Sequence, residues 1–185
     1  MKRQTIELTT DAMLAAMCTV LGIFARFLDF GFIKLSLESF PVLVAALLFG
    51  PVDGVVVALV GTFLSQLLQY GLDPSTPLWI IPYCIIGLIC GLYAKKYKYY
   101  NTSRQILTIV SGMEILLFAL NTVALYFYAE LVSVFHTEWI GKSGYAYVIS
   151  GIFPRIVVAV IKAAGFGFLM PPLLRALHRF RNRNN

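Results

Sequence analysis

The chain has 185 residues, of which 59% are hydrophobic and 13% are charged. Because soluble domains carry about 25% charged residues, this composition excludes an ordinary soluble protein and indicates a multi-pass membrane protein. The length leaves no room for a second domain, so we expect residues 1–185 to form a single integral membrane domain.

The net charge of +6 raises the question of a nucleic-acid partner, but the distribution of the basic residues argues against one. Ten of the fifteen Lys and Arg residues fall in three clusters that border apolar runs. Such clusters mark the cytoplasmic face of a membrane protein, so we expect both termini to be cytoplasmic. The clusters are Lys2 and Arg3; Lys95, Lys96, Lys98 and Arg104; and Arg175, Arg179, Arg181 and Arg183.

Six apolar runs predict an all-α membrane protein, a bundle of six transmembrane helices. A helix needs about 20 apolar residues to cross a bilayer, and the second run is shorter than that. It ends at Gly50-Pro51, a dipeptide typical of turns. The charge pattern then predicts outer loops at 29–38, 71–77 and 130–145. The six runs are 9–28, 39–49, 52–70, 78–94, 105–129 and 146–174.

The first run carries small residues at helical spacing, with Ala12 and Ala16 four positions apart. Small-residue faces let membrane helices approach one another closely. Two interpretations follow, namely docking of a partner helix and tight packing within the bundle. The residues by themselves leave the choice between these two open.

Polar and aromatic residues gather near the outer ends of the next two long runs. The third run carries Gln66 and Gln69, and the fourth opens with Trp79 and Tyr83. Aromatic residues at these depths often anchor a helix at the membrane interface, which is the alternative interpretation for Trp79 and for the tyrosines.

The last two runs contain charged residues within apolar sequence. A cation near the bilayer centre costs on the order of 3 kcal/mol unless it faces a cavity or a partner, so Arg155 is predicted to turn toward a pocket. The alternative is that Arg155 extends to the membrane interface. Lys162 and Glu114 lie deeper, and we expect them to form a structural ion pair because neither is tolerated alone.

One outward-opening pocket would satisfy the polar residues in the outer half of the bundle. Mostly apolar walls with a few converging polar groups are typical of a small-molecule site. The predicted binding residues are Arg26, Gln66, Gln69, Trp79, Tyr83, Asn121, Tyr126 and Arg155.

Patterns for catalysis or metal binding do not occur in the sequence. It has no Gly-rich phosphate loop and no His/Cys/Asp ligand spacing, and Cys18, Cys84 and Cys90 lie in apolar runs as packing residues. We therefore expect no cofactor and no enzyme activity in this chain. The alternative of another class is a membrane-embedded enzyme or a structural membrane protein, but a structural protein would have no reason to bury Arg155 beside Asn121.

Several stretches together resemble the substrate-binding S component of energy-coupling factor (ECF) vitamin transporters. The segment from Phe40 to Lys96 is the most specific part of this resemblance. An FGPxxG-like turn at Phe49, an LNT element at Leu120 and a Pro-Arg element at Pro154 are most similar to the folate branch. The resembling stretches are Ala12-xxx-Ala16, Phe40–Gly61, Leu72–Lys96, Leu120–Tyr128 and Phe153–Lys162.

Two positions depart from the folate branch. Val158 stands where a basic residue is expected three positions after Arg155. Ala124 and Leu125 stand where a Trp often follows the LNT element. Folate is therefore the first expectation for the ligand, and pantothenate, another B vitamin or a related small metabolite are the alternatives.

The resemblance also implies a mechanism, a set of partners and a location. An S component binds its vitamin from outside, docks on a transmembrane T component shared with two ATPase subunits, topples in the membrane and releases the vitamin inside. The ATPase activity would reside in those partners, and Ala12 and Ala16 would form the docking face. The location implied is the cell membrane of a prokaryote.

Overall fold

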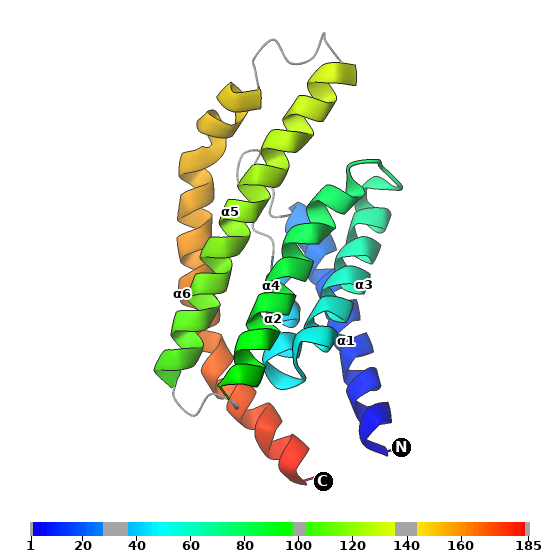
Figure 1. Ribbon diagram of the computed structural model, residues 1–185, viewed down its shortest axis with the longest axis vertical. Helices are drawn as coiled ribbons and strands as arrows, with labels where there is room; N and C mark the ends of the chain where they lie inside the picture. The colour runs from blue at the N-terminus through cyan, green and yellow to red at the C-terminus, as the bar shows by residue number, and fades with distance from the viewer. Residues whose placement is uncertain (1, 28–36, 98–102, 136–143, 184–185) are drawn as a thin grey trace.

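The computed structural model describes residues 2–27, 37–97, 103–135 and 144–183. Within these ranges the chain forms six α-helices and no strand, which confirms the all-α fold class (Figure 1). The helices are α1 (Lys2–Phe27), α2 (Ser39–Leu48), α3 (Pro51–Tyr70), α4 (Thr76–Lys96), α5 (Ser103–Phe135) and α6 (Gly144–Arg183).

Five of these helices are long and apolar enough to cross a membrane, which identifies the chain as a multi-pass membrane protein. The exception is α2, which has 10 residues. At 1.5 Å per residue it rises about 15 Å, roughly half of the hydrocarbon core of a bilayer. The structure therefore has five candidate membrane spans among its described residues, where the sequence predicts six crossing helices. The five candidate spans are Glu7–Ala25, Pro51–Tyr70, Thr76–Lys96, Arg104–Glu130 and Arg155–Leu177.

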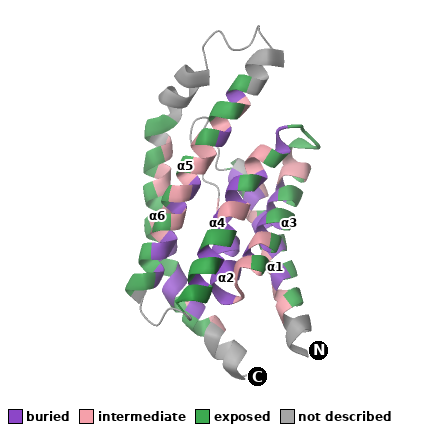
Figure 2. Cartoon of the chain, viewed as in Figure 1, coloured by how far each residue is buried: buried purple, intermediate pink, exposed green. Residues whose placement is uncertain are grey.

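The short helix α2 is the centre of the bundle. Its residues from Pro41 to Leu48 are all buried, whereas the longer helices expose many large apolar side chains on their outer sides (Figure 2). α1 packs against α3, α3 against α4, α4 against α5, and α5 against α6, so these five helices form an arc. α2 packs against α1, α3, α4 and α6, and therefore contacts both ends of the arc.

A close approach between helices explains the small residues of α3 and α4. The buried face of α3 includes Gly54, Ala58 and Gly61, which recur at helical spacing. A Cβ added at Gly87 of α4 would lie 2.7 Å from the carbonyl oxygen of Gly54. Gly50, whose φ of 121° is rarely adopted by other residues, turns the chain from α2 into α3. These contacts fix α2 and α3 beside α4.

The helices at the far end of the arc are longer than their apolar runs predict. α5 continues to Phe135, and α6 passes through Pro171 and Pro172 and ends at Arg183. Proline is tolerated inside membrane helices because neighbouring groups and local adjustments satisfy the freed backbone carbonyls. The basic tail is therefore a continuation of α6 rather than a separate segment.

Candidate functional site

Arg155 of α6 lies against α5 at the position of Asn121. The guanidinium Nη2 donates a long hydrogen bond of 3.4 Å to the backbone carbonyl oxygen of Asn121. Within the described residues the buried side-chain Oδ1 of Asn121 accepts no hydrogen bond. Since Asn121 lies nine residues before Glu130, where the span of α5 ends, this contact is roughly 13 Å inside that span. The position favours an inward-facing guanidinium.

A second charged contact joins the same two helices closer to the basic residues Arg104 and Arg175. Lys162 Nζ lies 2.9 Å from Glu114 Oε2, and the two side chains are 9% and 1% exposed. This confirms the predicted ion pair. Seven residues separate Arg155 from Lys162 and Glu114 from Asn121, so both contacts lie on one stripe of the antiparallel α5–α6 pair. The stripe is lined by polar groups that face the bundle.

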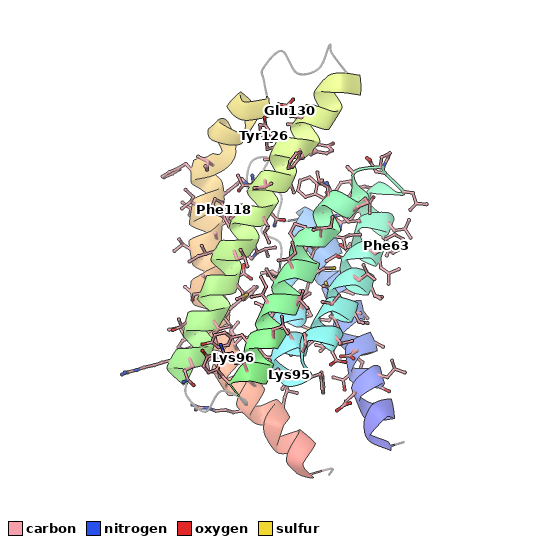
Figure 3. All side chains as sticks on the ribbon, viewed as in Figure 1. Phe63, Lys95, Lys96, Phe118, Tyr126 and Glu130 are labelled. Carbon is pink, nitrogen blue, oxygen red and sulfur yellow. The ribbon has the colours of Figure 1, made fainter. Side chains whose placement is uncertain are left out.

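The predicted aromatic residues divide into buried and exposed ones. The Trp79 ring of α4 packs against Tyr128 of α5 with ring centroids 5.7 Å apart, and Tyr83 is 5% exposed. Tyr126 is 42% exposed, with its ring edge against Phe127, at the end of α5 that Figure 3 labels with Glu130. Trp79 therefore packs against a neighbouring helix and Tyr83 is buried, whereas Tyr126 is more exposed than either.

The two predicted glutamines of α3 have different surroundings. Gln69 donates from Nε2 to the hydroxyl of Ser65 at 2.6 Å and to the carbonyl oxygen of Ser65 at 3.1 Å. Gln66 is half-buried. The backbone of Arg26 lies in the last turn of α1, and its side chain lies outside the described set. The role of Arg26 in ligand binding therefore stays a prediction.

The buried acid Glu38 is a polar residue that the sequence analysis did not assign to the site. It precedes α2, is 2% exposed, and accepts a 2.9 Å hydrogen bond from the hydroxyl of Ser65. Gly22 of α1 lies so close that an added Cβ would collide with Ser65 Oγ and Glu38 Oε1. The sequence feature that could have indicated its burial is its position directly before a short apolar run. That run forms the central helix α2, and Glu38 is buried with it.

The small residues of α1 divide between two faces. Ala15 and Cys18 are buried, and the hydroxyl of Thr19 donates to the carbonyl oxygen of Gly61 at 3.1 Å. Ala12 and Ala16 are exposed. The close packing inside the bundle therefore uses one face of α1, and Ala12 and Ala16 lie on another.

No group of three or more His, Cys, Asp or Glu side chains that could hold a metal ion occurs in the part of the chain that the structure describes. Some polar residues there form hydrogen bonds between elements, as Thr19 does with Gly61, Ser65 with Glu38 and Arg155 with Asn121. Such an arrangement defines a multi-pass membrane protein with polar groups in its interior.

Comparison with known proteins identifies the family. The family described as "ECF transporter, substrate-specific component" matches residues 7–174, and the chain belongs to it. The chain is also 30% identical over 83 residues to a UPF0397 protein from each of two strains of Streptococcus thermophilus. That match spans 45% of this chain and 45% of each relative, so the chain covers less than half the length of the relatives it matches. A substrate-specific component is not itself an enzyme.

Proposed function

We propose that this protein captures a vitamin from outside the cell, with folate as the first candidate. The observation that supports this most directly is the cation Arg155 beside the buried amide of Asn121, inside the apolar α5–α6 pair. A guanidinium offers a planar fork of donors that a carboxylate accepts in two hydrogen bonds. Folate, pantothenate and several other B vitamins carry a carboxylate.

The proposed binding site faces outward and includes the eight predicted residues, with Arg155 as its cationic end. Arg26 would supply a second cation for a ligand with two carboxylates, as in folate. Pantothenate or another B vitamin is the alternative, because Val158, Ala124 and Leu125 depart from the folate branch.

The test is identification and titration of the ligand. Mass spectrometry of detergent-solubilised protein should detect a co-purifying vitamin, and titration of the emptied protein should rank folate above pantothenate. Tighter binding of pantothenate would reverse the proposed preference. Saturable binding of neither vitamin would contradict both candidates.

The transport cycle is proposed from the family. After capture, the protein docks through Ala12 and Ala16 on a transmembrane T component with two ATPase subunits, topples in the bilayer of a prokaryotic cell and releases the vitamin inside. The exposure of both alanines supports docking over internal packing. Hydrolysis of ATP belongs to the partners in this scheme.

Both termini are expected to be cytoplasmic. α1 begins and α6 ends at the same end of the bundle as Lys95 and Lys96 (Figures 1 and 3). Basic residues concentrate on the cytoplasmic side, so that end should face the cytoplasm. In a Cys84→Ser background, an impermeant thiol reagent added to intact cells should label Leu72→Cys, which is 79% exposed, and spare the exposed Lys95→Cys. Labelling of Lys95→Cys and not of Leu72→Cys would show that the protein has the opposite orientation in the membrane.

A further inference from the structure

A chain of hydrogen bonds joins α3 to the start of α2 inside the bundle. Gln69 donates to Ser65, and Ser65 donates to the carboxylate of Glu38. The carbonyl oxygen of Ser65 only accepts, so the Gln69 atom bound to it is the amide nitrogen. The Gln69 Oε1 therefore points elsewhere, and it is buried without a hydrogen bond among the described residues.

The cluster of Glu38, Ser65 and Gln69 offers acceptors rather than donors. The Ser65 hydroxyl proton is used by Glu38, and its oxygen already accepts from Gln69. A carboxylate has about four lone-pair directions, of which the Ser65 hydroxyl uses one. The lone pairs of Glu38 that accept no hydrogen bond from the described residues, together with the Oε1 of Gln69, match a ligand group with neighbouring N–H donors.

Glu38, at the start of α2, lies deeper in the bundle than Arg155. Phe40, two residues after Glu38, packs against Phe166 of α6 with ring centroids 5.2 Å apart. Phe166 is eleven residues beyond Arg155 on the same helix, which corresponds to roughly 16 Å along its axis. Glu38 and Arg155 therefore have opposite charges and lie at different depths, which fits an elongated ligand with an anionic outer end and a donor-rich inner end.

From this arrangement we propose that Glu38, with Ser65 and Gln69, forms an inner subsite for an amino-substituted heterocycle. Such a ring presents an amino group next to a ring N–H, and a carboxylate accepts both hydrogen bonds as it does from a guanidinium. The 2-amino-4-oxopteridine of folate has this edge, whereas pantothenate does not. The inference rests on the proposed function and assigns a residue and a ligand chemistry to the inner end of that site.

The decisive experiment separates the two ends of folate. Full-length purified protein and its Glu38→Gln variant are titrated with folate, with 2-amino-4-oxopteridine alone and with p-aminobenzoylglutamate, which keeps both carboxylates and lacks the pteridine. A tenfold loss of affinity corresponds to about 1.4 kcal/mol, and a hydrogen bond to a charged group contributes at least that much binding free energy. Glu38→Gln should therefore weaken folate and pteridine binding about tenfold or more. Binding of p-aminobenzoylglutamate should stay within twofold of wild type.

Variants of other residues distinguish a specific loss of the subsite from general misfolding of the protein. Ser65→Ala should also weaken pteridine binding, whereas Thr62→Ala should not, because the buried Thr62 hydroxyl bonds to its own helix. Gly22→Ala, whose methyl group would displace Ser65 and Glu38, should behave like Glu38→Gln. Gly112→Ala is the control, since nothing lies within 4 Å of its added Cβ.

The outcomes distinguish this inference from the function on which it rests. If Glu38→Gln weakens folate and p-aminobenzoylglutamate equally, or neither, Glu38 is only a structural residue and the subsite is wrong. Wild-type protein could bind pteridine in a Glu38-dependent manner and yet fail to bind folate. That result would support the subsite and would reject folate as the transported vitamin. Failure of wild-type protein to bind pteridine overturns the inference, whatever the result with pantothenate.

Discussion

Replacing Ala12 and Ala16 together by Leu is expected to abolish vitamin uptake by the assembled transporter while leaving ligand binding by the purified protein unchanged. Both alanines are exposed, so two larger side chains can extend away from the bundle. A partner helix that approaches this face closely would meet them directly, because small residues are what permits close helix contact in a membrane. Uptake and binding should therefore separate in this variant.

The matched control enlarges exposed alanines on other helices. Ala119 of α5 and Ala164 of α6 are also exposed, and Ala119→Leu with Ala164→Leu should leave uptake intact. Co-purification of the T component distinguishes lost docking from lost transport after docking. If the Ala12/Ala16 variant loses ligand binding as well, this face supports the bundle itself, and the docking assignment is wrong.

Apolar runs and buried charges gave much of the prediction. The helices follow from apolar runs of helical length, and the Lys162–Glu114 ion pair follows from the cost of leaving either charge alone in an apolar helix. Both are properties of one helix or of a charge that requires a partner. Such features can be read without knowing how the helices are arranged.

The arrangement around α2 was not predictable in the same way. Glu38 belongs to an expected outer loop by sequence, and its burial becomes visible only once α1, α3, α4 and α6 pack around the ten-residue α2. Likewise, Trp79 and Tyr126 have the same aromatic character and expected depth, yet one packs against Tyr128 and the other is exposed. The direction in which each side chain points depends on helix packing that residue type does not encode.

Arg155→Ala is expected to weaken ligand binding about thirtyfold or more. Removing one member of a buried charged pair costs about 2–5 kcal/mol, because the other charge stays buried without its partner. At about 1.4 kcal/mol per factor of ten, the lower bound already corresponds to roughly thirtyfold. Titration of purified protein with folate, or with the vitamin identified by co-purification, measures the effect. Arg175→Ala is the control, because it removes an exposed arginine from the other end of the same helix.

Arg155→Lys tests whether the geometry of the guanidinium matters in addition to its charge. Lysine keeps the positive charge but presents a compact ammonium instead of a planar fork, so it should recover only part of the lost affinity. Full recovery would indicate a simple charge contact without paired hydrogen bonds. Wild-type affinity in Arg155→Ala would show that the side chain extends to the membrane interface, and the cationic end of the proposed site would then have to be sought at Arg26.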